Sequence, residues 1–322
     1  MGGKAFGFEA KRMDKWEYED TLALNLARID SSQVFPSMGK GVISYSTKET
    51  FGDIDILVPS ESFSFDKFWD KHKFRYKDYK RNGGVISLLD KQDRQIDIIT
   101  TPLNIYWIHF NYLAYNDMGN FIGRIAKSLN LKYGHDGLSL IVRYKGDSTR
   151  KIGVILVSTD VQFIYNLLNI PYRPYKSYDT MEQIYSDIMS SKYYHKDSFL
   201  LENQSHHARV RDRKRKSYHG MLNYLKENDT STEPRRNYSI EETLNMLPSF
   251  VTEEYIKITS DYDKKMYEKT LFNGNIVSDV TGLKGKELGV FMASIKDKVD
   301  IYGNVREQII ELFTDYQRGV SQ

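Results

Sequence analysis

The sequence predicts an α+β fold, with a small mixed β-sheet backed by two helices and followed by a mostly helical C-terminal part. Three short runs at 54–58, 83–89 and 94–100 are rich in β-branched and aliphatic residues, which is typical of strands. Segments 14–28 and 62–79 alternate with these runs and have helix-forming or aromatic residues at helical spacing. The second half of the chain has mainly helical patterns.

The first helix, 14–28, starts at Asp14, a residue that suits an N-cap, and we expect this helix to pack behind the sheet. Gly83-Gly84 ends the second helix and starts the hairpin of the last two strands, and Pro102 closes this first unit. One face of the second helix, 62–79, is expected to bury four aromatic rings: Phe65, Phe68, Trp69 and Phe74.

The middle of the chain contains an apolar and aromatic segment at 105–115 and a helix at 117–129 with one apolar stripe. A second hairpin, at 138–144 and 151–158, either extends the sheet or forms a small insert beside it. A short helix at 160–168 follows. On these grounds we predict a first domain over residues 1–170, with its core at 14–102.

Helical patterns predominate in the predicted second domain, 171–322, at 178–190, 202–226 and 253–271. The segment 226–238 is polar and contains a proline, which makes it the best candidate for a linker. After it, a capping box is expected to start a helix, with Ser239 as the N-cap and Glu242 three residues later.

Composition restricts the class of protein. Of the 322 residues, 40% are hydrophobic and 28% charged, as in ordinary globular proteins. The sequence has no cysteine, which excludes disulfides and zinc–thiolate sites and fits a reducing compartment. No apolar run approaches the length of a membrane span, and the first residues lack a signal-peptide core, so we expect no membrane partner and a cytoplasmic location. The net charge of +3 is too small to indicate a nucleic-acid binder by itself.

Three aspartates form a candidate metal site. Asp53 and Asp55 lie two residues apart at the start of the run 54–58, so their side chains should point to the same face of a strand. Asp97 is the only acidic residue of the run 94–100, where an aspartate is unexpected in a buried strand. Adjacent carboxylates repel each other unless a cation lies between them, and Mg²⁺ prefers oxygen ligands. Three such carboxylates can bridge two Mg²⁺ ions, with Mn²⁺ as an alternative ion.

These residues resemble the DNA polymerase β-like nucleotidyltransferases, in which a glycine turn precedes an Asp-hydrophobic-Asp strand and a lone acid follows on a later strand. The resemblance covers about the first hundred residues, and it implies a catalytic domain of the polymerase β palm type. Asp53 and Asp55 would hold both metals, and Asp97 would help to activate the attacking hydroxyl. The nucleoside triphosphate would be bound by the glycine-rich positions Gly39, Lys40, Gly41 and Gly52, although the usual Gly-Ser pair is Gly39-Lys40 here.

Basic residues outside this region are candidates for phosphate binding. On the helix 117–129, Asn120, Arg124 and Lys127 either face solvent or reach the triphosphate. The helix 202–226 contains a dense basic run that only Asp212 offsets, so its like charges repel one another unless a polyanion binds. The run could bind either RNA backbone or the triphosphate, or it could be a solvated face. It contains Arg209, Arg211, Arg213, Lys214, Arg215 and Lys216.

A second resemblance lies near the C-terminus. The pattern Gly-hydrophobic-x-Gly-x-Glu-hydrophobic-Gly at 282–289 resembles a turn that leads into a helix in bacterial tRNA nucleotidyltransferases and poly(A) polymerases. Backbone amides at a helix start favour an anion, and Lys284 and Lys286 add positive charge there. The Gly-Gly-x-Val-Arg-Asp turn and the Asp-x-x-Arg-Arg motif of the CCA-adding enzymes are missing, so the sequence does not identify the nucleotide.

The two resemblances together imply a template-independent nucleotidyltransferase that adds a nucleoside monophosphate to the 3′-hydroxyl of a tRNA-like RNA. Two alternatives remain open at this point. The acceptor could be a small molecule or a protein, as for antibiotic-modifying enzymes and some toxins. The protein could also be a catalytically silent nucleic-acid-binding protein.

Overall fold

The structure is a computed structural model that describes residues 3–32, 38–173, 178–229 and 236–320. The chain forms two compact units. The larger unit comprises Met1–Ile141 and Val154–Val251, and the smaller unit comprises Val142–Gly153 and Thr252–Gln322. The domain boundary predicted at residue 170 thus falls inside the larger unit.

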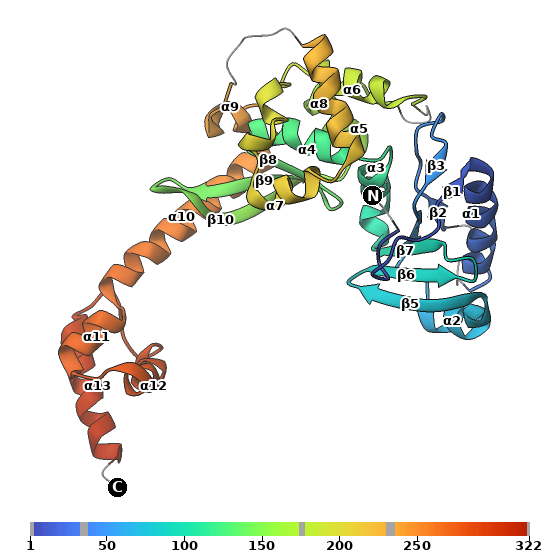
Figure 1. Cartoon of the computed structure of the whole chain (residues 1–322). Helices are drawn as coiled ribbons and strands as arrows, with labels where there is room; N and C mark the ends of the chain where they lie inside the picture. Colours follow the sequence, from blue (N-terminus) through green and yellow to red (C-terminus); the bar gives the residue numbers. More distant parts are fainter. Residues whose placement is uncertain (1–2, 33–37, 174–177, 230–235, 321–322) are drawn as a thin grey trace. The chain divides into compact units, whose positions relative to one another are not determined.

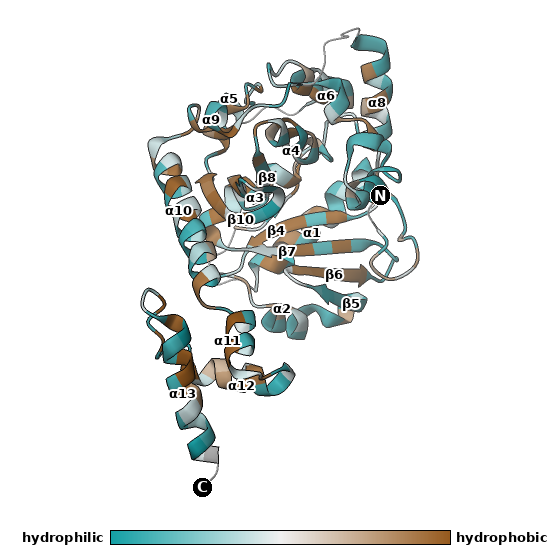
Figure 2. Cartoon of the chain, turned by 90° about the vertical axis from the view of Figure 1, so that its left-hand side faces the viewer, coloured by the Kyte–Doolittle hydropathy of each residue, from teal (hydrophilic) through white to brown (hydrophobic). Residues whose placement is uncertain are grey.

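The larger unit contains a five-stranded mixed sheet (Figures 1 and 2), with the strand order β2-β4-β7-β6-β5. The central strands β4 and β7 are parallel, and every other neighbouring pair is antiparallel. The three strands expected at 54–58, 83–89 and 94–100 are confirmed as β4, β6 and β7. The bounds are Lys40–Gly41 for β2, Ile54–Pro59 for β4, Tyr76–Asn82 for β5, Val85–Asp90 for β6 and Gln95–Thr101 for β7.

Helices α1 (Lys15–Asp30) and α2 (Phe65–His72) pack against one face of this sheet. Asp14 is the N-cap of α1, as expected, and forms a capping box with Glu17. The cluster between helices and sheet consists of side chains that alternate along the strands, among them Ile54, Ile56, Ile96 and Ile98, which are fully buried. A short pair, β1 (Met13–Asp14) and β3 (Thr50–Phe51), lies at the start of α1.

The prediction of one helix over 62–79 is wrong in its second half. After α2 the chain makes a 3₁₀ turn at Lys73–Arg75 and enters β5, which pairs with β6 around Gly83. Gly83 has φ +57°, a value that glycine adopts without strain. Phe65 and Phe68 are buried as expected, but Phe74 is 62% exposed, because it lies in the turn rather than on the buried face of a helix.

The opposite face of the sheet is covered by α3 (Tyr106–Leu113), whose Tyr106 and Phe110 pack on Leu57 and Ile99. The 3₁₀ turn Leu103–Ile105 connects β7 to α3. Next comes α4 (Met118–Ser128), which buries the apolar stripe expected for the helix at 117–129.

A second sheet of three strands follows in the order β10-β9-β8. Strands β9 (Gly137–Tyr144) and β10 (Asp147–Ser158) confirm the hairpin expected there, and it belongs to a separate sheet. Strand β8 (Leu131–Gly134) was not expected from the sequence. Helices α5 (Val161–Leu167) and α6 (Met181–Met189) confirm the helices expected at 160–168 and 178–190 within a few residues.

The single helix expected over 202–226 is instead divided. The structure has a 3₁₀ turn at Leu201–Asn203, α7 at His206–Asp212 and α8 at Lys216–Asn228. Ser205 caps α7, and Arg215 has an extended backbone just before α8. The break between α7 and α8 places the basic side chains of residues 211–216 on the end of one helix, a turn and the start of another helix. These side chains repel one another less than they would on a single continuous helix.

The linker candidate 226–238 begins in α8, and residues 230–235 lie outside the described part of the chain. Its far end is fixed within the larger unit, because the Tyr238 amide donates to the Ser128 carbonyl and the Tyr238 carbonyl accepts from Asn130. The capping box of Ser239 and Glu242 is confirmed and starts α9 (Ile240–Leu244). Earlier in the larger unit, between α6 and α7, the chain also makes a 3₁₀ turn at Lys196–Ser198.

The smaller unit contains helices α11 (Gly274–Thr281), α12 (Gly285–Ile295) and α13 (Val305–Val320) and most of α10 (Ser249–Leu271). The mostly helical C-terminal part is thus confirmed. The last three helices share an apolar core that includes Val277, Phe291 and Ile309. The tip of the β9–β10 hairpin also belongs to this unit, where the Tyr144 ring lies 5.0 Å from that of Tyr262. Within the described residues, no helix combines the length and the apolar character needed to cross a membrane.

Candidate metal centre

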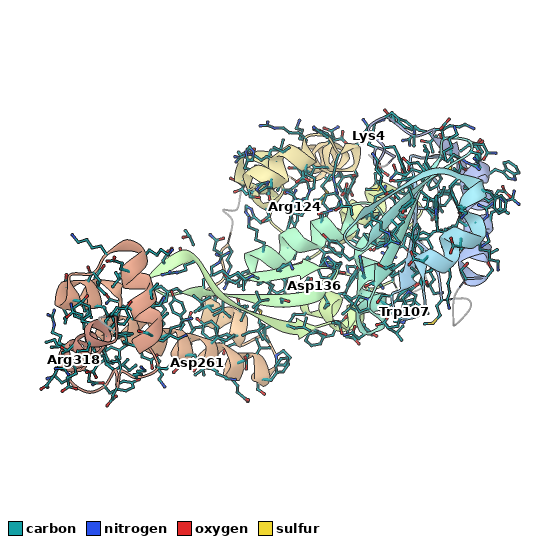
Figure 3. The ribbon with its side chains drawn as sticks, turned by 90° about the horizontal axis from the view of Figure 1, so that it is seen from below. Lys4, Trp107, Arg124, Asp136, Asp261 and Arg318 are labelled. Carbon is teal, nitrogen blue, oxygen red and sulfur yellow. The ribbon has the colours of Figure 1, made fainter. Side chains whose placement is uncertain are left out.

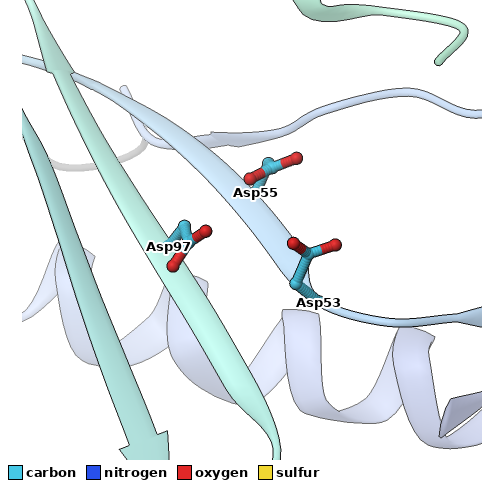
Figure 4. A group of neighbouring side chains, drawn as sticks. All are labelled: Asp53, Asp55 and Asp97. Atoms are coloured by element: carbon cyan, nitrogen blue, oxygen red, sulfur yellow. The ribbon is translucent and has the colours of Figure 1, made fainter. Parts of the chain in front are cut away.

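The three aspartates come together on one face of the parallel strand pair (Figure 4). Asp55 is opposite Asp97 in the β4–β7 register, and Asp53 immediately precedes β4. One carboxylate oxygen from each residue can be chosen so that all three lie within 4.8 Å of one another. The expected convergence of Asp53, Asp55 and Asp97, here called the triad, is therefore confirmed. In the described part of the chain, no other set of three or more acidic, histidine or cysteine side chains is grouped in this way.

The electrostatics of the triad are unfavourable without a cation. Burial raises the pKa of Asp53. Burial, followed by repulsion from Asp53 and Asp97, raises the pKa of Asp55 well above its ordinary value. Burial also raises the pKa of Asp97 to about 6, against hydrogen bonds from Ser87 and Gln95 that lower it. A cation between the three groups would favour their charged forms.

The donors around the triad hold two of its carboxylates in place. The Gly3 amide donates to Asp53 Oδ2 at 3.0 Å. The Gln95 side-chain amide donates to both oxygens of Asp97, at 3.0 and 2.9 Å. Each carboxylate oxygen can accept more than one bond, so these contacts leave room for a metal. Three carboxylates supply only hard oxygen ligands, and their spacing and repulsion fit divalent ions such as Mg²⁺ or Mn²⁺.

A cavity of about 280 Å³ adjoins the triad and is lined by Asp53 and Asp55. The aromatic rings of Tyr18, Phe51 and Tyr112 form part of its wall. All its lining residues belong to the larger unit. Its other polar lining residues are cations or hydrogen-bond donors: Ser44, Lys48, Asn116, Asn120, Arg211 and Arg215. Cations and carboxylates in one cavity are suited to a ligand that binds metal and carries negative charge itself.

The two arginines of the cavity are held by buried carboxylates. Arg211 donates through Nε to Asp212 Oδ1 at 2.8 Å. Arg215 pairs with Asp117, which also accepts from the Ser217 hydroxyl. Asp212 and Asp117 are only 2% and 7% exposed. These contacts fix the position of each guanidinium, so the basic run presents two of its members, Arg211 and Arg215, to the cavity.

The sequence did not indicate three further cavity residues. Lys48 Nζ and Ser44 Oγ both donate to Asn116 Oδ1, at 3.3 and 3.1 Å. Burial lowers the pKa of Lys48, whereas Asp53 and Asp55 act to raise it. Ser44 and Lys48 belong to a polar stretch without periodicity. Asn116 has a positive φ of 60°, which asparagine tolerates better than most residues. This backbone conformation cannot be read from the sequence.

The glycine turn assigned to the triphosphate has a packing role in this structure. A Cβ at Gly41 would lie 2.6 Å from Leu22 of α1, and one at Gly39 would lie 3.4 Å from Leu26 and Ile29. The Lys40 ammonium lies 5.5 Å from the ring centre of Trp107. None of Gly39, Lys40, Gly41 or Gly52 is among the residues that line the cavity.

Arg124 (labelled in Figure 3) is buried, at 6% exposure, so the expectation of a solvated face is wrong for this residue. It pairs with Asp212, lies over the ring of Tyr218 and donates to the carbonyls of Ser198 and Phe199. Its contact with the cavity is indirect, because Asp212 also binds Arg211. On the same helix, Asn120 lines the cavity and Lys127 is exposed.

The remaining basic candidates are not among the residues that line the cavity. Arg209 donates to the Gln204 carbonyl, and Arg213 is exposed in the turn between α7 and α8. In the smaller unit, Lys284 and Lys286 are exposed at the start of α12. The expected turn that leads into a helix is present there, with Gly282 at φ +76° and Gly285 at φ +55°.

Comparison with known proteins adds no further information on this site. No protein-family model matches the chain, and a search of curated proteins found no match.

Proposed function

We propose that the protein is a metal-dependent nucleotidyltransferase of the DNA polymerase β type, which transfers a nucleoside monophosphate from a triphosphate to a hydroxyl of an RNA acceptor. One observation carries the proposal: Asp53 and Asp55 of the triad line the same cavity as Lys48, Arg211 and Arg215. A metal-bound triphosphate is a ligand that requires both kinds of group at once. The mixed sheet with α1 and α2 on one face is compatible with a palm-type domain.

In the proposed reaction, the acceptor 3′-hydroxyl attacks the α-phosphorus. The new oxygen–phosphorus bond forms as the bond between the α-phosphorus and its leaving oxygen breaks, the proton of the attacking hydroxyl passes to the Asp97 carboxylate, and pyrophosphate departs. Two Mg²⁺ ions held by the triad would activate the hydroxyl and neutralise charge on the pyrophosphate. Lys48, Arg211 and Arg215 bind the phosphates, and Asn116 orients Lys48 and Ser44. The protein contributes mainly positioning and fixed charge.

Two exposed basic features support RNA as the acceptor. Arg213, Lys214 and Lys216 are exposed around the turn from α7 to α8, next in sequence to the cavity arginines. In the smaller unit, the turn before α12 presents Lys284 and Lys286 beside the amides of a helix start, which suits a sugar-phosphate backbone.

The test is incorporation of labelled nucleotides. The purified protein is incubated with Mg²⁺ and each of the four ribonucleoside and four deoxyribonucleoside triphosphates, with a tRNA that lacks its terminal nucleotides, with total RNA, or alone. We expect label in RNA for wild type and none for Asp53→Ala or Asp97→Ala, with circular dichroism confirming that both variants are folded. Label on the protein itself in the incubation without RNA, or on a small-molecule acceptor added in place of RNA, would replace the RNA assignment. Equal incorporation by wild type and both variants would refute the active-site assignment. Absence of both incorporation and Mg²⁺-dependent triphosphate binding would indicate a catalytically silent protein.

A further inference from the structure

The N-terminal segment 3–10 contacts one triad carboxylate directly and is linked to a second through Gln95. Gly3 donates its amide hydrogen directly to Asp53 Oδ2. Ala5 acts through Gln95: its amide donates to Gln95 Oε1 at 2.9 Å, and the Gln95 side-chain nitrogen donates to both oxygens of Asp97. One short segment is thus connected to carboxylates on two different strands.

This segment is well anchored. The Ala10 amide donates to the Gly3 carbonyl at 2.7 Å, which closes the segment into a loop. Lys80 Nζ donates to the Ala5 carbonyl at 3.2 Å and lies 5.3 Å from the centre of the Phe6 ring. Gln95 is 3% exposed, so its amide has little freedom to turn away from Asp97. Figure 3 labels Lys4, which belongs to this segment.

The close approach at Gly3 requires glycine. Its φ of +81° is unfavourable for other residues, and a Cβ there would lie 2.4 Å from the carbonyl oxygen of Gly52, next to Asp53. Gly7, in the same segment, has a similar φ of +87°, but a Cβ there would have nothing within 4 Å. An alanine at either glycine would therefore have a similarly strained backbone, but only an alanine at Gly3 would also collide with the residue that precedes Asp53.

We propose that segment 3–10, with Gln95, is a positioning element of the metal centre: it fixes the orientation of Asp53 and Asp97 so that one oxygen of each converges with an oxygen of Asp55. This inference rests on the proposed metal centre. Hydrogen-bond donors behind metal-ligating carboxylates set their geometry, and loss of such a partner typically weakens metal binding by about 10–100-fold. A segment that merely covered the sheet would not change metal affinity when shifted.

The experiment measures Mn²⁺ binding to the full chain by electron paramagnetic resonance, without nucleotide. Gly3→Ala displaces the amide from Asp53, Gln95→Leu removes the link to Asp97, and Gly7→Ala is the matched control. We expect about tenfold weaker Mn²⁺ binding or more for the first two variants, and affinity within about twofold of wild type for Gly7→Ala. Thermal unfolding is recorded for each variant, and Gln95→Leu serves as the test if Gly3→Ala does not fold.

The outcomes separate this inference from the proposed function. Wild-type Mn²⁺ affinity in folded Gly3→Ala and Gln95→Leu would overturn the positioning role and leave the metal centre intact. An equal loss in Gly7→Ala would also overturn it, because backbone strain alone would then explain the effect. Asp55→Asn is included as a reference. If it binds Mn²⁺ as well as wild type does, the triad is not the metal site, and both the inference and the proposed function fail.

Discussion

At the scale of single residues, the triad combines three charges that destabilise one another. The pKa of Asp97 is raised to about 6 by burial and by Asp53. Between about pH 4 and pH 6 the folded state therefore holds a proton that the unfolded state has lost, so the free energy of unfolding falls as pH rises through this window. A rise in the pKa of Asp97 from 3.8 to about 6 lowers the free energy of unfolding above pH 6 by roughly 3 kcal/mol, relative to its value below pH 4.

We therefore expect Asp97→Asn to be more stable than wild type at pH 7.5 in EDTA, because the buried charge is gone, and to lose less stability between pH 4.5 and pH 7.5. Mg²⁺ should raise the unfolding midpoint of wild type at pH 7.5 and have little effect on the variant. Urea denaturation at both pH values, with and without Mg²⁺, measures the free energy of unfolding of the two proteins. If the free energies of unfolding of wild type and Asp97→Asn change equally with pH, the prediction is wrong.

Lys48 and Lys40 allow a direct choice between the cavity and the glycine turn as the triphosphate site. Lys48 lines the cavity and bonds Asn116, whereas Lys40 lies near Trp107 outside the lining. We predict that Lys48→Met lowers kcat/KM for the nucleotide roughly 10–100-fold, since a charged hydrogen bond to phosphate is lost. The matched Lys40→Met variant should stay within about twofold of wild type. Steady-state kinetics with varied triphosphate decide, and the reverse ranking would restore the glycine turn as the binding site.

The sequence indicated the triad but not the cavity, because the triad follows from patterns within single strands and the cavity depends on contacts between distant segments. Alternation within a strand determines the face on which Asp53 and Asp55 lie, and a lone aspartate among isoleucines is noticeable. Lys48 and Asn116 are 68 positions apart, and no periodic pattern connects them. The sequence leaves Arg124 either on a solvated face or at the triphosphate, and it does not show the buried ion pair because the partner, Asp212, is 88 positions away.

At the scale of elements, the break between α7 and α8 sorts the basic run into two sets. Arg211 and Arg215 face the cavity because Asp212 and Asp117 hold them there, whereas Arg213 is exposed in the turn. Helix spacing over 202–226 could not predict this division. The break coincides with tertiary ion pairs that involve α4 and the residue preceding it.

This division predicts different effects for neighbouring arginines. Arg211→Gln should weaken triphosphate binding about tenfold or more, because a guanidinium that binds phosphate is replaced by a neutral amide. Arg213→Gln, the matched control two residues away, should leave triphosphate affinity unchanged. Calorimetric titration with a non-hydrolysable triphosphate and Mg²⁺ measures both. If the two variants lose affinity equally, the effect is one of net charge and the cavity assignment of Arg211 is wrong.

At the scale of the whole molecule, strands β4, β6 and β7 and the helices α1 and α2 behind them follow from patterns within single segments, although β2, β5 and the strand order were not predicted. The division into units does not. The tip of the β9–β10 hairpin belongs with α10 in the smaller unit, so this unit is built from two separate stretches of chain. A boundary based on composition and proline positions cannot detect a unit whose parts are about a hundred residues apart.

The proposed roles of the two units predict that nucleotide and RNA binding can be altered separately. Reversing both charges at the start of α12, in Lys284→Glu/Lys286→Glu, should weaken binding of a tRNA-like RNA and reduce the slope of log affinity against log salt by about one per lysine. Triphosphate binding should not change, because the cavity lies within the larger unit. The matched control, Lys296→Glu/Lys298→Glu, makes the same change of charge just beyond the end of the same helix, where both lysines are also exposed. Filter binding at several salt concentrations distinguishes the pairs. Equal losses would mean that overall charge attracts the RNA, and no loss in either pair would remove the start of α12 from the RNA-binding surface.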